Sequence, residues 1–180
     1  VVGTASLRRQ AQILHRRPGL RVVPFRGNVD TRLAKLADGQ AAATVLALAG
    51  LLRLGKDAAA TEVLEPDAML PAVAQGAIGI ERRADDERAA ALLGRIADRA
   101  TLTAVAAERA LLAVLDGSCR TPIAALAELD GSGDLVLRGL VATPDGSRVA
   151  TGRWSGAEAD AERLGREGGR ELRRRAEFLD

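Results

Sequence analysis

The chain has 180 residues and a formal net charge of +2; 47% of its residues are hydrophobic, and its only aromatic side chains are two phenylalanines and one tryptophan. This composition supplies an aliphatic core and disfavours a nucleic-acid-binding protein that stacks bases on aromatic rings. No apolar stretch is long enough to cross a membrane, no signal peptide is visible, and the single cysteine suits a reducing compartment, so we expect a cytoplasmic protein. The chain opens on a strand-like segment without an initiator methionine, and we expect an N-terminal part to be absent.

The first third of the sequence alternates between strand and helix patterns. Apolar runs rich in Val, Leu and Ala predict three strands, at 1–4, 20–25 and 44–49. Helical spacing predicts helices between them, one after the N-cap Ser6, one from Val29 to Gly39, and a single turn at 51–54. The continuous run at 44–49 is typical of a strand buried on both faces. This alternation predicts a parallel sheet with right-handed crossovers.

The rest of the chain predicts a different class of unit. A loop at 69–76 and a short strand at 77–81 are followed by two helices, from Asp85–Asp86 to about Ala97 and from about Thr101 to Leu115. Three strands follow at 123–129, 135–143 and 148–154, joined by hairpin turns at 130–133 and 144–147. A long polar helix begins near Ala157, and Gly168 and Gly169 weaken its middle. We therefore expect a small α+β unit with a three-stranded antiparallel sheet.

The first candidate site is the strand–turn–helix at residues 3–9. A helix N-terminus has unpaired N–H groups and a partial positive charge, which together bind anions, and Thr4 and Ser6 add hydroxyl groups. Arg8 and Arg9 oppose the helix dipole, a local conflict of the kind found at functional sites. A solvated basic helix end is the alternative.

Three further arginines follow predicted strands or lie one helical turn away, namely Arg26, Arg32 and Arg53. Ligands of open α/β sheets bind beyond the carboxyl ends of the strands, so these arginines can converge with the first site on one crevice. Such a crevice suits a polyanionic small molecule that carries phosphates or carboxylates. Scattered surface arginines are the alternative. The glycine-containing stretch 70–79 would let a backbone approach that ligand closely.

Cys119, the only cysteine, follows three turn-forming residues and is expected on a loop. The adjacent Arg120 would favour the nucleophilic thiolate. A buried structural cysteine is the alternative. His15 is the only histidine and is expected at the surface, so no metal site is predicted.

Five motifs occur in the order found in the porphobilinogen deaminase (hydroxymethylbilane synthase) family, at 3–10, 26–29, 31–33, 70–76 and 117–119. The resemblance runs over essentially the whole chain. One departure lies in the last motif, where Ser118 replaces the glycine that usually precedes the cysteine.

The resemblance implies a transferase of haem biosynthesis that joins four porphobilinogen molecules into the linear tetrapyrrole hydroxymethylbilane. It further implies a dipyrromethane cofactor that is joined to Cys119 by a thioether. The residues implied to hold cofactor and substrate are Thr4, Ser6, Arg8, Arg9, Arg26, Arg32, Arg53 and Gln75. A non-enzymatic anion-binding module on the same scaffold is the alternative, and the cysteine loop argues against it.

The resemblance also implies how the chain is divided. Residues 1–76 would form a cofactor-binding domain similar to one lobe of a type 2 periplasmic binding protein, and 98–180 a C-terminal α+β domain that carries the cofactor cysteine. Residues 77–97 would be the return segment of an otherwise absent N-terminal domain, which would contain the family's catalytic aspartate. We therefore assign no catalytic residue here, expect the isolated chain to be inactive, and expect a monomer at full length without membrane or nucleic-acid partners.

Overall fold

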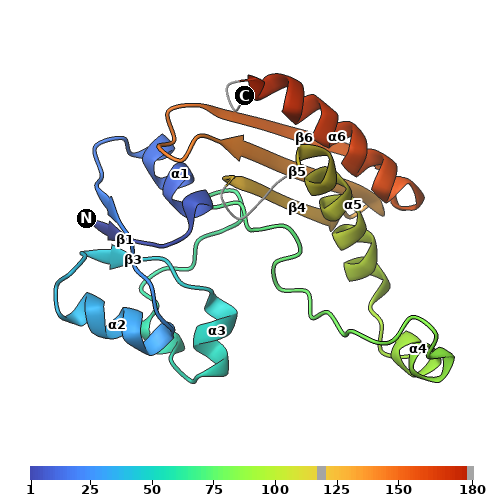
Figure 1. Ribbon diagram of the computed structural model, residues 1–180, viewed down its shortest axis with the longest axis horizontal. Helices are drawn as coiled ribbons and strands as arrows, with labels where there is room; N and C mark the ends of the chain where they lie inside the picture. Colours follow the sequence, from blue (N-terminus) through green and yellow to red (C-terminus); the bar gives the residue numbers. More distant parts are fainter. Residues whose placement is uncertain (117–120, 178–180) are drawn as a thin grey trace.

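The computed structural model describes residues 1–116 and 121–177 and contains two three-stranded sheets in separate parts of the chain (Figure 1). The first sheet is parallel, with the order β2-β1-β3, and the second is antiparallel, with the order β4-β5-β6. The predicted combination of a parallel-sheet unit and an antiparallel α+β unit is confirmed. None of the helices within the described ranges is both long and apolar enough to span a membrane.

The parallel sheet is small, and the first two helices of this unit begin at side-chain caps. Its strands are β1 (Val2–Gly3), β2 (Val22–Val23) and β3 (Ala43–Thr44), and its helices are α1 (Leu7–Arg16), α2 (Val29–Ala37) and α3 (Leu48–Arg53), followed by the 3-10 turn η1 (Asp57–Ala59). The predicted N-cap Ser6 accepts the N–H of Arg9 at 3.4 Å, and Asn28 accepts that of Thr31 at 2.9 Å. Phe25 covers Gly3 so closely that a Cβ there would lie 2.5 Å from the ring, which explains a glycine in the central strand.

The predicted strand at 44–49 is wrong beyond its first residue. Strand β3 ends at Thr44 and α3 begins at Leu48, with Gly50 inside the helix instead of ending a strand. Val45 and Leu46 line a cavity rather than a second buried face, and Leu48 is 37% exposed. The apolar residues at 44–49 therefore belong to a cavity wall and to the start of a helix. The periodicity of the sequence cannot distinguish such a run from a strand that is buried on both faces.

The middle segment also departs from its prediction. No strand forms at 77–81 in the described structure, and Ile78 is 80% exposed. The helix α4 (Glu87–Gly94) begins at the predicted cap Asp86 but ends before Ala97, and its predicted apolar residues Leu92 and Ile96 are exposed. Figure 1 shows α4 at the end of the molecule, away from both sheets. A strand needs a neighbour for its backbone, and no strand of the described residues pairs with this segment.

The antiparallel unit matches its prediction closely. Its elements are α5 (Arg99–Leu115), β4 (Ile123–Leu129), β5 (Asp134–Ala142), β6 (Val149–Ala157), the 3-10 turn η2 (Glu158–Asp160) and α6 (Ala161–Arg175). Alternate residues of β5 face α5 and α6, so Leu135, Leu137 and Val141 are fully buried. The predicted weakening by Gly168 and Gly169 misses their role. A Cβ at these positions would lie about 3 Å from the ring of Trp154 and from the backbone oxygen of Leu111, respectively, so the pair permits close packing of α6.

Helix α1 connects the two units. Its Ala11 is fully buried against the opposite face of the antiparallel sheet, in a cluster with Leu140 and Ala142. The hairpin between β5 and β6 touches the same helix, because a Cβ on Gly146 would lie 2.4 Å from the backbone oxygen of Ala11. The N-terminus of α1 points toward the parallel sheet while its middle packs on the antiparallel one, so this helix positions its first turn, which contains Arg8 and Arg9, relative to both units (Figure 1).

Candidate functional site

A cavity of about 350 Å³ lies beside the first turn of α1. Its walls come from the first turn of α1, from α2, from β3 and the residues after it, from α3, and from the segment at 59–75. Arg8, Arg9 and Gln75 line it together with apolar residues such as Val45 and Leu70. The cavity is at the carboxyl end of β3, the place predicted for a ligand in an open α/β sheet.

The turn before α1 is built by two hydroxyl groups. Thr4 is 2% exposed, and its hydroxyl accepts the N–H of Ser6 at 3.2 Å. Ser6 in turn caps the helix by accepting the N–H of Arg9. Neither residue is among those that line the cavity, so the described contacts of Thr4 and Ser6 are those that shape the turn.

Arg8 and Arg9 bring a concentrated positive charge into the cavity. Arg9 donates through Nη1 to the backbone oxygen of Val45 at 2.8 Å. The Arg8 Nε is buried without a hydrogen-bond partner in the described structure. Burial lowers the pKa of both guanidinium groups from their ordinary value, and the neighbouring charges of Arg9 on Arg8 and of Arg32 on Arg9 lower it further. Both groups remain cations, held close together with no carboxylate of the described residues paired to them, and this arrangement favours an anionic ligand.

The other predicted arginines lie outside this cavity. Arg32 donates through Nε to the oxygen of Gly27 at 2.9 Å, near enough to Arg9 to affect its pKa. Arg26 and Arg53 are exposed, and neither lines the cavity in the described structure. Lys35, which the sequence analysis overlooked, donates to the oxygen of Arg26 at 3.1 Å and lies 5.7 Å above the Phe25 ring. Cys119 lies outside the described residues.

The cavity wall at 69–76 is a loop, as predicted, and it is tied to the antiparallel unit. The oxygen of Pro71 accepts the N–H of Ala125 in β4 at 3.2 Å. The carboxylate of Glu108 in α5 accepts the N–H of Ala74 at 2.5 Å and that of Ala127 at 2.8 Å. Ala74 has a left-handed backbone, with φ of +56°. The loop that lines the cavity is therefore also bonded to the C-terminal unit, and its position depends on both.

Glu108 is another functional candidate that the sequence analysis did not identify. It is 3% exposed, and burial raises the pKa of its carboxyl above the ordinary value, although the two N–H donors oppose the shift. Its sequence signal is a carboxylate inside the alanine- and leucine-rich run of α5. A buried acid in such a run is expected to have a specific partner.

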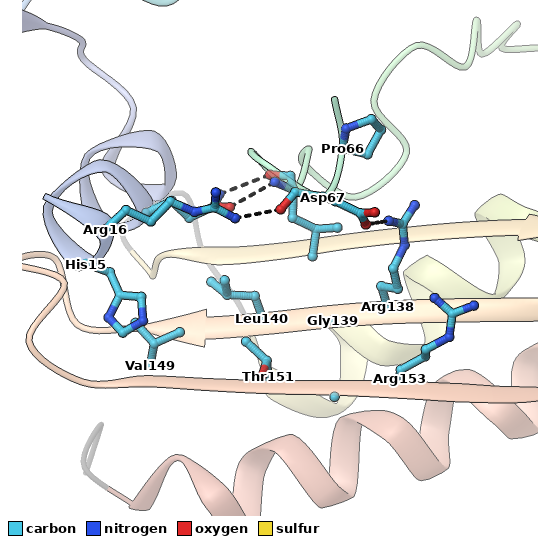
Figure 2. Close-up of a pocket in the computed structure, with 13 residues that line it drawn as sticks. His15, Arg16, Pro66, Asp67, Arg138, Gly139, Leu140, Val149, Thr151 and Arg153 are labelled. Atoms are coloured by element: carbon cyan, nitrogen blue, oxygen red, sulfur yellow. Dashed lines mark hydrogen bonds and ion pairs between the residues drawn. The ribbon is translucent and has the colours of Figure 1, made fainter. Parts of the chain in front are cut away.

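A second cavity of about 540 Å³ lies between α1, residues 66–70 and the outer face of the antiparallel sheet (Figure 2). Figure 2 shows Asp67 between two arginines. Arg16 donates to the backbone oxygen of Asp67 at 2.6 Å, and Arg138 forms ion pairs with the carboxylates of Asp67 and Glu128. Its positive charges are therefore partly compensated by this chain's own acids. No group of three or more potential metal ligands is close enough to bind a metal ion among the residues described.

Two family models match the chain in sequence order. Residues 1–91 match "Porphobilinogen deaminase, dipyromethane cofactor binding domain", and residues 102–174 match "Porphobilinogen deaminase, C-terminal domain". The first match contains the cavity and its arginines, and the second contains the antiparallel sheet and most of α5 and α6.

Similar curated proteins have the same name. The porphobilinogen deaminase of Paracoccus denitrificans is 58% identical over 182 residues, which cover 100% of this chain and 58% of the relative. The chloroplastic porphobilinogen deaminase of Oryza sativa is 53% identical over 178 residues, which cover 98% of this chain and 50% of the relative. The chain thus spans about half the length of the curated relatives that it matches. On the family models and these identities, the chain belongs to the porphobilinogen deaminase family.

Proposed function

We propose that the protein containing this chain is a hydroxymethylbilane synthase, a transferase that joins four porphobilinogen molecules with loss of ammonia. The observation that supports this most directly is the buried, unpartnered Nε of Arg8 in a cationic cavity within the cofactor-binding match. Each pyrrole of such a chain has two carboxylates, and a carboxylate is the natural partner of an unpaired guanidinium.

The residues of this chain fit a dipyrromethane. Arg8 and Arg9 would bind carboxylates of the group, and the partial positive charge at the N-terminus of α1, where both arginines lie, favours the same anions. Gln75 would donate or accept a hydrogen bond at the opposite wall. When bound, the cofactor supplies the pyrrole chain that is extended. The cations of this cavity hold and orient anionic groups there.

The arginines outside the cavity are suited to binding substrate and product rather than the cofactor. Arg32 lies beside the cavity, and Arg26 and Arg53 lie outside it on solvent-exposed positions. We propose that these three bind carboxylates of incoming porphobilinogen and of the growing product, which needs more cations than the first cavity offers.

We propose the division into domains at 1–76, 77–97 and 98–180, with the first domain resembling one lobe of a type 2 periplasmic binding protein. The exposed Ile78, Ile80, Leu92 and Ile96 in the middle segment support its packing on another part of a longer protein. The isolated 180-residue chain is therefore expected to show no turnover of porphobilinogen in a steady-state assay. Measurable turnover would contradict this division of labour. At full length we expect a cytoplasmic monomer.

Intact-mass measurement on the protein at its full natural length tests the function. The wild type should show a mass excess equal to two linked pyrroles, and Cys119→Ser should lose both this excess and all activity. Ser118→Gly, which restores the family's usual residue beside the same thiol, is the matched control and should stay loaded. Retention of the cofactor by Cys119→Ser would refute the attachment, and anion binding without turnover in the wild type would favour a non-enzymatic module.

A further inference from the structure

The middle of α1 contains a buried polar side chain, Gln12, that has no role in the proposed binding of carboxylates. Gln12 is 6% exposed, and its amide Nε2 donates to the backbone oxygen of Leu70 at 3.0 Å. Its Oε1 accepts the N–H of Leu70 at 2.8 Å. One side chain thus satisfies both backbone groups of a residue 58 positions away, in the manner of a hydrogen-bonded pair between strands.

Leu70 is part of the wall of both cavities. It lines the 350 Å³ cavity together with Pro71 and Gln75, and it also lines the second cavity on the sheet side. Its position therefore decides how far the segment 69–76 approaches the arginines of α1.

Gln12 also connects this wall with the helix turn that holds the arginines. Its Nε2 lies 3.3 Å from the backbone oxygen of Arg8, one turn earlier on the same helix. The side chain is in this way anchored to the turn of Arg8 and bonded to the opposite wall. The N–H and C=O of Leu70 are half-buried, and such groups are costly to leave unpaired, so loss of the amide would displace Leu70 rather than leave it in place.

We infer that Gln12 is a positioning residue, which holds the wall segment 69–76 at a fixed distance from Arg8 and Arg9 so that Gln75 faces the bound carboxylates. This inference rests on the proposed function for its consequence in catalysis, but not for the contact itself. Gln12 does not touch the ligand in this account and acts through Leu70.

The test compares Gln12→Met and Gln12→Glu with the wild type, all at full natural length. Methionine keeps the length of the side chain but removes both hydrogen bonds to Leu70 and the one to Arg8, while glutamate keeps the acceptor for the Leu70 N–H and loses the donor. Gln10→Met is the matched control, because Gln10 lies on the same helix and its amide donates to Pro144 at 3.0 Å rather than to Leu70. The two readouts are amide hydrogen exchange at Leu70 and the separate values of KM and kcat for porphobilinogen.

In Gln12→Met we expect Leu70 exchange to be at least about tenfold faster. We also expect KM to rise by about tenfold or more through the misplaced wall. Gln12→Glu should be intermediate, and it keeps the test valid if the methionine variant does not fold; Gln10→Met should leave both readouts unchanged. Unaltered amide exchange at Leu70 would show that Gln12 does not hold this residue in place. Faster exchange with an unchanged KM would show that holding Leu70 does not position the wall for binding. If the wild type shows no turnover, the proposed function fails, while Leu70 exchange still decides whether Gln12 holds the wall.

Discussion

The two cavities differ in how their arginines are neutralised. In the cavity beside α2 and α3, Arg8 and Arg9 are half-buried and no carboxylate of the described residues pairs with them. In the cavity on the sheet, Arg138 pairs with Asp67 (Figure 2) and also with Glu128. An arginine cluster therefore says little by itself, because charge compensation decides whether it stabilises the fold or remains available to a ligand.

The largest effect should follow from changes at the uncompensated arginines. Arg8→Lys and Arg9→Lys keep the charge but lose the planar donor fork, and each should weaken cofactor or substrate binding by about 1.5–3 kcal/mol. Cofactor occupancy by intact mass and steady-state kinetics at full length measure this. Arg153→Lys, on the outer face of β6, is the control and should have little effect. Equal, small effects at all three positions would remove the distinction between the cavities.

A second effect concerns the buried acid behind the cavity wall. Glu108→Gln leaves one of two N–H donors, the half-buried one of Ala74 or the buried one of Ala127, without a good acceptor, and it should lower the free energy of unfolding by about 1–3 kcal/mol. Urea denaturation of the full-length protein measures this. An unchanged midpoint and slope would show that the two bonds contribute nothing.

The same variant has a defined pH signature. Burial, and to a smaller extent the charge of Glu128, raise the pKa of Glu108 in the folded protein, so the folded state binds the proton more tightly than the unfolded state. This contribution to stability is present below the ordinary pKa of 4.5 and is lost as the pH rises through the raised value. Glu108→Gln should abolish that component. Parallel stability curves for variant and wild type across this range would contradict the assignment.

The exposed arginines should give a smaller effect on loading than on turnover. Arg26→Lys and Arg53→Lys lie outside the first cavity, so cofactor occupancy should stay near that of the wild type while KM for porphobilinogen rises a few-fold, roughly 1 kcal/mol or less for an exposed charge. Loss of occupancy in either variant would mean that the first cavity extends to these residues. Substrate titrations at constant cofactor occupancy separate the two cases.

The smallest effect is expected at the compensated cavity. Asp67→Asn breaks an ion pair whose carboxylate side chain is 87% exposed, and this should cost about 1 kcal/mol of stability or less. Neither KM nor cofactor occupancy should change. A loss of binding comparable to that of Arg8→Lys would place the second cavity in the reaction.

The sequence predicted those features that are encoded locally. Ser6 and Asp86 are N-caps because their side chains bond to backbone groups three residues later, and the hairpin strand at 123–129 was placed correctly at both ends because turn residues bound it. The strand predictions at 44–49 and 77–81 were wrong because apolar residues in a sequence do not show which part of the protein, if any, covers them. One run lines a cavity and the other has no neighbour in the described structure.

The site was predictable only in part for the same reason. The convergence of Arg8 and Arg9 follows from one strand–turn–helix, a local motif, whereas the direction of Arg53 depends on where the short α3 begins. Gln12 and Glu108 were missed because their partners lie 58 and 34 residues away, and a single sequence does not show such pairings. The signal for both was a polar residue at a helix position of the kind that is buried. Such a residue indicates that a hydrogen-bond partner exists but does not identify it.

The central claim is that the uncompensated arginine cavity receives the carboxylates of the cofactor. Nitrogen-15 NMR of the arginine Nε–H groups, compared between the loaded full-length protein and its unloaded Cys119→Ser variant, tests this most directly. On loading, we expect the Nε–H resonances of Arg8 and Arg9 to shift and their protons to exchange with water more slowly, because charge-assisted hydrogen bonds form there. The resonance and the exchange rate of Arg153 should stay unchanged. Identical Arg8 and Arg9 resonances in the two forms would contradict the claim.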